Sequence, residues 1–341
     1  MNEGKVSENV LKHSILHQIH TKCDEVLNGA GIGEDCAVFA LSDNEVLASC
    51  AREAAVAVQA DMDPAGAPRD TVTMAHLIQK CVNNLAAGGA RPIAAIITLL
   101  LPGETEPETV RKLMAEAEGA CAALSMQIAG GQTRVTRAVT VPYAVVTGYG
   151  KAPREGRPSL RKVKPGQDIV LSKWIGLEGT SVLARHRKAE LLARYPAYLA
   201  EDAGAFDKYL SVIPEAATAM GSGVCAMHDA SEGGIFGALW EFAQGAGVGL
   251  TIDLKKIPLR QETVEICECC GINPYELLSG GCLIMAAEDG KALVQALNAE
   301  GIAASVIGRT TDKKDRVICN EEEVRYMERP KTDEIYKICE G

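Results

Sequence analysis

Apolar and polar positions along the first half of the chain alternate in segments typical of strands and amphipathic helices. Three apolar runs predict strands, at 37–41, 54–61 and 92–101. Between the second and third runs, Leu77, Ile78, Cys81 and Leu85 recur at helical spacing. They predict a helix that begins near Asp70 and ends at Gly88-Gly89.

A second helix is predicted to begin near "TEPE", where Thr105 and Glu108 form a capping box and Pro107 lies in the first turn. Its apolar stripe contains Val110, Leu113, Met114, Ala117, Cys121 and Leu124. The sequence GGQTRV (130–135) then predicts a turn that leads into a closing strand.

The second half of the chain repeats this alternation. Its predicted strands are "DIVLS", "VCAM", "VGLTIDL", "CLIMAA" and "ASVIGR", and its predicted helices lie at 235–244, near 262–270 and near 290–299. The segment "KWIGLEGT" (173–180) is predicted to be a loop feeding a helix from Thr180 or Ser181. A basic, proline-bearing stretch at 151–166 predicts a linker, so we expect domains at 1–150 and 167–341, both mixed α/β.

Composition and charge exclude several classes of protein. The chain has 341 residues and a net charge of −10, which argues against a nucleic-acid partner. The start, MNEGKVSENV, is too polar for a signal peptide, and the apolar run at 93–101 is too short to span a membrane. The 12 cysteines are scattered, which favours reduced thiols and a cytoplasmic location. The cluster at 267–270 is interpreted as a helix with incidental thiols, not as a metal site.

Polar residues at predicted strand ends and in loops are the candidates for chemistry. They are Asp35, Asp61, the pair Asn83-Asn84 and Asp229. Magnesium prefers oxygen ligands of this kind, although each residue also suits a turn or a helix cap. The glycine-rich segments "GGQT", "GLEGT" and "SEGG" suit either close-approach turns or phosphate cradles. No Walker or Rossmann pattern is present, so the residues alone favour Mg-nucleotide chemistry only weakly.

Five motifs in order resemble the aminoimidazole ribonucleotide (AIR) synthetase superfamily. They are "GIGEDCAVF", "CVNNLAAGGARP", "GGQT", "MHDASEGGIFGALWEFA" and "GINPYELLSGGCLI". The resemblance runs from about residue 4 to residue 310. The "KWIGLEGT" loop and the opening "GKVSENVLKHSIL" are most similar to the HypE-like, AIR-synthase-related branch.

The resemblance implies an ATP-dependent two-domain α/β (α+β) fold. The N-terminal domain would form a homodimer through its sheet, the C-terminal domain would be ferredoxin-like, and ATP would lie between the domains near the dimer contact. The implied magnesium ligands are Asp35, Asp61, Asn84 and Asp229. The implied nucleotide-binding residues are Glu34, Asn83, Gly130, Gly131, Gln132, Thr133 and Lys173, the last of which is interpreted equally as a solvated lysine.

Two positions depart from the family pattern. Relatives carry an aspartate where this chain has Asn84, and many carry an acid or histidine where it has Gln132. Because an amide oxygen has no formal charge, we expect divalent metal to bind weakly. These two positions therefore leave two alternatives: the protein hydrolyses ATP, or it binds ATP without turnover.

The resemblance also implies a mechanism, namely phosphoryl transfer from ATP to an amide or carbonyl oxygen. In HypE-like proteins the acceptor is a carboxamide on a cysteine near the C-terminus, delivered by a carbamoyl-transfer maturation partner. Here Cys339 lies third from the end, and it is interpreted either as this acceptor or as an incidental thiol on a short helix, EIYKI. His228 is the second candidate catalytic residue. Two alternatives stay open: a small-molecule ATP ligase or kinase, and a non-catalytic nucleotide-binding protein.

Overall fold

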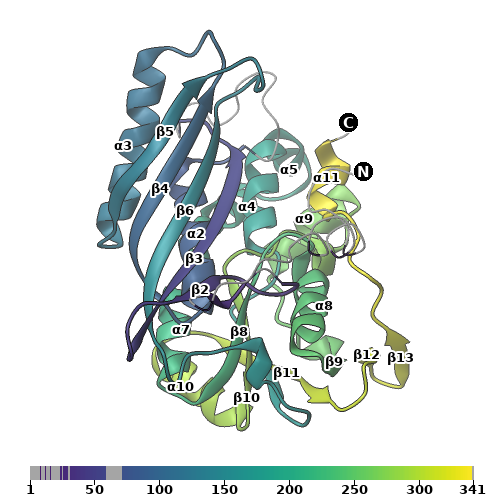
Figure 1. Ribbon diagram of the computed structural model, residues 1–341. Coiled ribbons are helices and arrows are strands. Elements are labelled where there is room, and N and C mark those ends of the chain that lie inside the picture. The colour runs from purple at the N-terminus through teal and green to yellow at the C-terminus, as the bar shows by residue number, and fades with distance from the viewer. Residues whose placement is uncertain are drawn as a thin grey trace.

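The fold consists of two sheet-containing halves, seen in a computed structural model (Figure 1). The described residues are 8, 12, 16, 24, 26–29, 31–58 and 71–339, without the side chain of Cys339. Asp61 and Asp70 lie outside this part of the chain. The mixed α/β architecture predicted from the sequence is confirmed.

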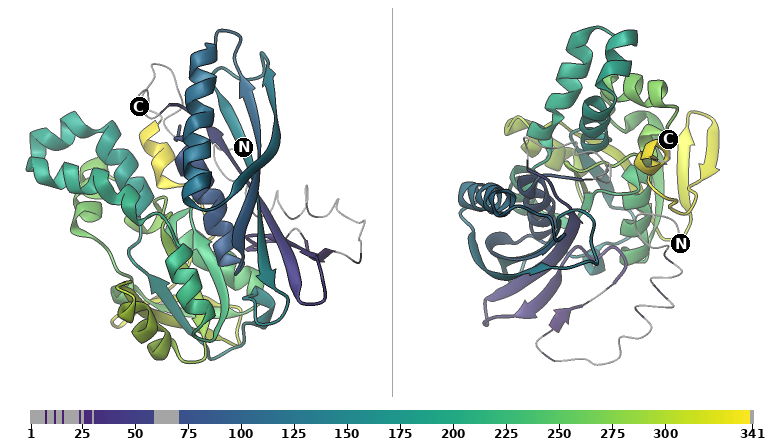
Figure 2. Two further views of the ribbon diagram at one scale, coloured as in Figure 1. Left: turned by 90° about the vertical axis from the view of Figure 1, so that its left-hand side faces the viewer. Right: turned by 90° about the horizontal axis from the view of Figure 1, so that it is seen from above.

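The N-terminal half is built on a six-stranded sheet whose strand order is β1-β2-β3-β6-β4-β5. Its strands are β1 (Val26–Asn28), β2 (Ala37–Ala40), β3 (Glu45–Ala55), β4 (Arg91–Leu101), β5 (Gln127–Val135) and β6 (Tyr143–Pro153). The helices α2 (Met74–Ala87) and α3 (Pro107–Ala123) cover one face, whereas no described helix covers the other (Figure 2).

Strand β3 differs from the predicted strand at 54–61. It begins at Glu45 and ends at Ala55, and Val46, Ala48 and Cys50 alternate inward toward α2. This period of two is the usual sign of a strand with one buried face. The same inward-facing row continues to position 52, which is an arginine.

The predicted helix over 70–88 is confirmed as α2, with a later start. Thr73 caps it, because its hydroxyl accepts the backbone N–H of His76 at 3.0 Å. The predicted stripe of Leu77, Ile78, Cys81 and Leu85 is buried against the sheet. In α3, by contrast, the predicted capping box is wrong: Glu106 is the N-cap, and no side chain caps the helix.

The C-terminal half is built on a seven-stranded sheet of order β13-β12-β9-β11-β7-β10-β8. Its strands are β7 (Asp168–Ser172), β8 (Val224–Ala230), β9 (Gly249–Asp253), β10 (Cys282–Ala287), β11 (Ala304–Thr311), β12 (Arg316–Asn320) and β13 (Glu323–Tyr326). The four strands β11-β7-β10-β8 pair antiparallel in the order 4-1-3-2. That order is the core of a ferredoxin-like fold, as predicted.

The helices of this half are α4 (Leu177–His186), α5 (Lys188–Arg194), α6 (Ala197–Gly204), α7 (Ile213–Met220), α8 (Gly234–Ala246), α9 (Gln261–Cys270), α10 (Gly290–Ala299) and α11 (Glu334–Cys339). Helix α4 begins at Leu177, three residues before the predicted start, because Gly176 adopts a left-handed conformation as its N-cap. Glu178 therefore lies in the first turn of a helix and not in a loop.

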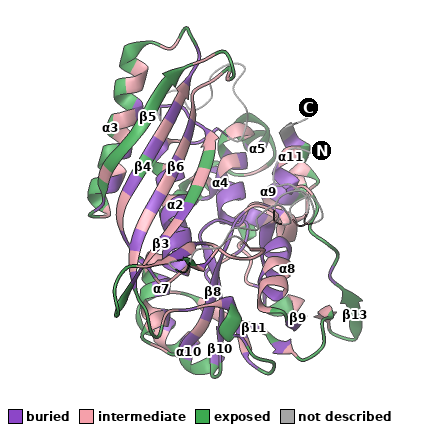
Figure 3. Cartoon of the chain, in the orientation of Figure 1, coloured by how far each residue is buried: buried purple, intermediate pink, exposed green. Residues whose placement is uncertain are grey.

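The predicted turn at 130–135 is wrong, because these residues belong to the edge strand β5. Gly130, Gly131, Gln132 and Thr133 are all exposed along this strand (Figure 3). A Cβ at Gly131 would lie 1.9 Å from the backbone oxygen of Ile97. The glycine therefore permits close pairing with β4 and does not mark a turn.

Helix α2 lies where the two halves meet (Figures 1 and 2). One of its faces packs on the N-terminal sheet, and its other face bonds to the C-terminal half through His76, Lys80 and Asn83. Within the described residues, no helix is long and apolar enough to cross a membrane.

Candidate functional site

The candidate site joins the two halves of the chain. We call it the acid pocket and define it by Asp35, Asn84, His228 and Asp229. Asp35 precedes β2, Asn84 lies on α2, and His228 and Asp229 lie near the end of β8. The structure thus brings together three of the four predicted magnesium ligands and the predicted catalytic histidine, from segments up to 194 residues apart.

A close backbone approach holds Asp35 in place. Gly33 has a φ of 75°, and a Cβ there would lie 2.5 Å from the backbone oxygen of Glu241 on α8. Only glycine fits this position without strain. The Gly33 loop can therefore pack directly on the helix and direct Asp35 toward β8.

Asp35 and His228 form the central ion pair of the pocket. The Nδ1 of His228 lies 2.9 Å from the Oδ2 of Asp35, and its Nε2 lies 3.5 Å from the Oε2 of Glu241. Burial opposes a charge on this ring, but the two carboxylates outweigh it and raise the pKa of His228 to about 10. The imidazole is therefore protonated at neutral pH, and its Nδ1–H donates to Asp35.

Asp229 is the most deeply enclosed acid of the pocket. Its backbone N–H donates to the Oδ2 of Asp35 at 3.4 Å, and its own Oδ1 is buried without a hydrogen-bond partner. Burial raises the pKa of Asp229 to about 7, and the charges of Asp35 and Glu178 act in the same direction. The positive charges of Arg52 and His228 lower the pKa of Asp229 and offset this rise in part.

Arg52 is a site residue that the sequence reasoning missed. It lies on β3 and donates from Nη2 to the Oδ1 of Asn84 at 2.9 Å. Burial opposes its charge, but the carboxylates of Asp229 and Asp35 raise the pKa of Arg52 further. A signal was available: an arginine that continues an inward-facing row of Val46, Ala48 and Cys50 needs a buried partner.

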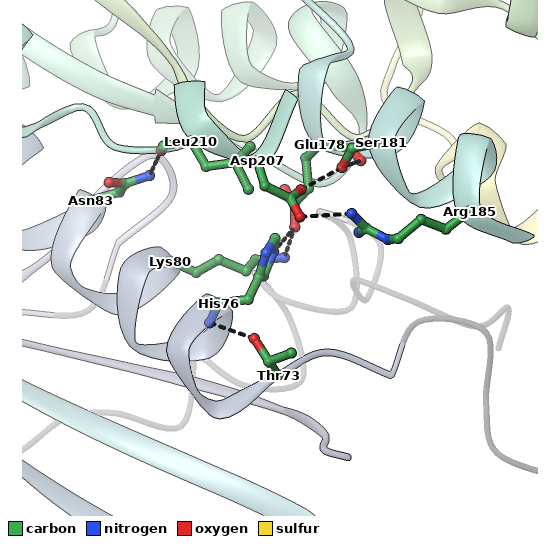
Figure 4. A network of polar contacts seen from close by, with 9 residues as sticks. All are labelled: Thr73, His76, Lys80, Asn83, Glu178, Ser181, Arg185, Asp207 and Leu210. Carbon is green, nitrogen blue, oxygen red and sulfur yellow. Dashed lines mark hydrogen bonds and ion pairs between the residues drawn. The ribbon is translucent and has the colours of Figure 1, made fainter. Parts of the chain in front are cut away.

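A second polar cluster lies at the other end of α2 (Figure 4). The buried Oε1 of Glu178 on α4 lies 2.6 Å from the Nε2 of His76 and 2.9 Å from the Nζ of Lys80. Burial alone would raise the pKa of Glu178, but Lys80 and His76 hold it well below its usual range. This cluster ties the N-terminal half to the C-terminal half.

Asn83 and Lys173 need correction as predicted nucleotide-binding residues. Asn83 donates to the backbone oxygen of Leu210 at 2.7 Å and accepts from the backbone N–H of Val212 at 3.1 Å. The buried Nζ of Lys173 makes three contacts, at 2.7 Å to the oxygen of Tyr209, 2.6 Å to that of Ser211 and 2.6 Å to the Oε1 of Glu215. An ammonium has three donors, so none of Lys173's is left for a phosphate.

The glycine-rich segments do not form one cradle within the chain. Strand β5, with Gly130 to Thr133, is the sheet edge four pairing steps from β2, roughly 19 Å at the usual strand spacing. In "GLEGT", the N–H of Gly176 donates to the Oγ of Ser279 at 2.9 Å. In "SEGG", the N–H of Gly233 donates to the Oδ2 of Asp333 at 2.6 Å.

Glu34 accepts from the Nδ2 of Asn28 at 2.7 Å and lines a cavity of about 30 Å³ beside Asp35. That volume has room for about one water molecule. Asp61 and the side chain of Cys339 lie outside the described residues.

Comparison with known families settles where the chain belongs. Residues 33–152 match the N-terminal domain of AIR synthase related proteins, and residues 164–320 match their C-terminal domain. The chain belongs to the AIR synthase related family. The predicted superfamily is therefore confirmed, and two relatives place the chain on the HypE-like branch.

The carbamoyl dehydratase HypE of Rhodobacter capsulatus is 31% identical over 234 residues, which are 67% of this chain and 66% of that protein. A Methanocaldococcus jannaschii protein, provisionally described as a hydrogenase expression/formation protein, is 26% identical over 345 residues, or 98% of this chain and 97% of that one. A hydrogenase maturation protein HypE solved in complex with ATP matches with a TM-score of 0.66, covering 98% of this chain and 97% of that one. At 18% identity, this last likeness shows the fold alone.

The pocket of this AIR synthase related protein does not suit the magnesium ion that the resemblance implies. The amide oxygen of Asn84 already accepts from Arg52, and Asp35 already pairs with His228. Among the described residues, no three His, Cys, Asp or Glu side chains gather as a metal site. The Oδ1 of Asp229 is without a partner, but Mg²⁺ needs several anionic oxygens and the guanidinium of Arg52 already opposes a second positive charge, so these residues do not fit it.

Proposed function

We propose that this chain has a HypE-like, ATP-dependent role, in which it activates a carboxamide by phosphorylating its oxygen. One observation carries the proposal: Asp35 of the N-terminal half and His228 of the C-terminal half meet at 2.9 Å in a buried pocket between the family's two matched domains. This pair supports a role at the domain junction, where the resemblance implies that ATP binds.

The proposed reaction has two balanced steps. In the first, the carboxamide oxygen attacks the γ-phosphorus of ATP, an O–P bond forms, and ADP leaves. In the second, the C–O bond breaks and inorganic phosphate leaves with that oxygen, while the nitrogen loses two protons, one to the departing phosphate and one to water, to give a nitrile-like carbon. On Cys339 the product would be a thiocyanate. Catalysis of this kind depends mainly on positioning and on neutralising phosphate charge.

The residues of the pocket suit the second requirement. The imidazolium of His228 and the guanidinium of Arg52 are fixed positive charges inside a largely enclosed site. Fixed charges stabilise developing negative charge without the cost of reorganising water. We therefore assign His228 to phosphate stabilisation and not to nucleophilic attack.

We also propose two partners, a second copy of this chain and a carbamoyl-transferring maturation protein. The first proposal is supported by the sheet face that no described helix covers and by the exposed edge strand β5. The second is supported by the carbamoyl dehydratase activity named for the Rhodobacter capsulatus relative. Light scattering of the purified chain, at several concentrations, tests the homodimer.

The test of the proposed function is to incubate the full chain with ATP, Mg²⁺ and a carbamoyl donor, then to measure phosphate release and the intact mass. We expect released phosphate and a mass increase that is lost in Cys339→Ala. Cys319→Ala, a half-buried thiol on β12, is the matched control and should keep the adduct. Absence of both phosphate and adduct would contradict the proposal.

A second candidate function is nucleotide binding without turnover. The hydrogen bond between Arg52 and Asn84 favours it, because both residues weaken a divalent-ion site. This candidate predicts saturable ATP binding with no phosphate release, whatever carbamoyl donor is added.

A further inference from the structure

The acid pocket contains a cation of its own. The guanidinium of Arg52 enters from β3 and reaches the amide of Asn84 at 2.9 Å. Its strongest attractive charges are the carboxylates of Asp229 and then Asp35. Asn84 is one of the implied ligands of the ion, so an ion and the guanidinium would compete for its amide oxygen and for the charge of the two carboxylates.

Two unpaired atoms show that the guanidinium is fixed there and not at the surface. The Nε of Arg52 and the Oδ1 of Asp229 are both inaccessible to solvent and have no hydrogen-bond partner. Buried charged groups are costly unless an opposite charge faces them. Each group therefore depends on the other for charge balance, across a gap that no direct hydrogen bond closes.

Asn84 suits a guanidinium better than a metal ion. Its Oδ1 accepts from Arg52, and its Nδ2 donates to the backbone oxygen of Asp35 at 3.3 Å, so its amide orientation is fixed. An aspartate at this position would offer two anionic oxygens and could not donate. The amide instead accepts from a cation and donates to a carbonyl, which a carboxylate cannot do.

We propose that the guanidinium of Arg52 permanently takes the place of a divalent cation, so that the acid pocket excludes Mg²⁺ and presents a protein-borne positive charge to its anionic ligand. The inference concerns the cation alone and holds whether or not that ligand is ATP. It differs from simple loss of a metal site, because the positive charge remains in the pocket.

The test is a titration of the full-length protein with Mn²⁺, followed by the electron paramagnetic resonance signal of the free ion. For the wild type we expect no site with a dissociation constant below about 1 mM. In Arg52→Asp we expect at least about tenfold tighter binding, because an opposing charge becomes a ligand. Since the whole chain is used, Asp61 takes part in the measurement.

Two further variants keep the test decisive. Arg91→Asp makes the same charge change at an exposed position of the same sheet and should leave Mn²⁺ binding as in the wild type. The double variant Arg52→Gln/Asn84→Asp changes the size of the side chains little. It replaces Arg52→Asp if that variant does not melt cooperatively, and we expect the same gain in Mn²⁺ affinity.

The proposal is overturned if the wild type binds Mn²⁺ at a stoichiometric site that Asp35→Asn removes. It is also overturned if neither Arg52 variant gains a site, because the guanidinium would then not be what excludes the ion. A separate ATP titration in EDTA distinguishes this failure from that of the proposed function, since it reports the nucleotide without any metal.

Discussion

The carboxylate of Glu178 lies 2.9 Å from the ammonium of Lys80, although one residue belongs to the C-terminal half and the other to the N-terminal half. His76, one helical turn before Lys80, lies 2.6 Å from the same oxygen (Figure 4). Helix α2 thus uses one face to bind its own sheet and another to bind α4. The acid pocket lies along this junction, so its geometry depends on these contacts.

We expect Glu178→Ala to lower the free energy of unfolding by about 3 kcal/mol, because it leaves the ammonium of Lys80 and the imidazole of His76 without their buried partner. Chemical denaturation monitored by circular dichroism measures this. Glu201→Ala, an exposed glutamate on α6, is the control and should change stability by less than about 0.5 kcal/mol. Equal effects of the two substitutions would contradict the assigned contact.

The same contact predicts how stability depends on pH. Because the folded pKa of Glu178 is depressed below its unfolded value of 4.5, its contribution is complete above that pH and is lost as the pH falls through the folded pKa. The stability difference between the wild type and Glu178→Gln should therefore shrink as the pH falls below about 4.5. A difference that grows on acidification would refute this sign.

Lys173 and Glu215 form a buried pair at 2.6 Å, and their removal should be strongly non-additive. Lys173→Met alone leaves a buried carboxylate without its cation, and we expect a cost of about 3 kcal/mol. The double variant Lys173→Met/Glu215→Leu should recover more than half of this loss. If the double variant is as unstable as the single one, the ion pair is not the reason that Lys173 is buried.

Asp333 fixes the C-terminal helix α11 to the start of α8. Its carboxylate accepts the backbone N–H groups of Gly233 at 2.6 Å, Ile335 at 2.9 Å and Leu278 at 3.1 Å. We expect Asp333→Ala to speed hydrogen exchange across α11 by at least about tenfold, because α11 can then open locally without breaking these three hydrogen bonds. Exposed Glu322→Ala is the control, and unchanged exchange in the Asp333 variant would show that α11 is held by its apolar contacts alone.

Local patterns predicted most of the elements but not how charged residues meet. The sequence identified β4 from the apolar run at 93–101 and α2 from the spacing of Leu77, Ile78 and Cys81. Burial of one face produces such a pattern in residues that are close in sequence. Gly131 led to the wrong prediction of a turn, because the sequence does not distinguish a glycine that allows two backbones to approach from one that forms a turn. The surrounding sheet, not the segment, decides between the two.

The candidate site was predicted in part for the same reason. Asp35, His228 and Asp229 stand out in short motifs, and the structure brings them together. Arg52 was missed and Lys173 was assigned to the nucleotide, because their contacts depend on partners that only the tertiary fold supplies, Asn84 for Arg52 and Glu215 for Lys173. The spacing of residues can show that a side chain faces inward, but it does not show which distant residue that side chain contacts.

Calorimetric titration of the full-length chain with ATP tests the central claim, an ATP-dependent role, most directly. The account predicts saturable binding that is at least about tenfold weaker in Arg52→Gln, because the acid pocket loses a fixed positive charge, and unchanged in Arg91→Gln, at an exposed position of the same sheet. No saturable heat from the wild type would contradict it.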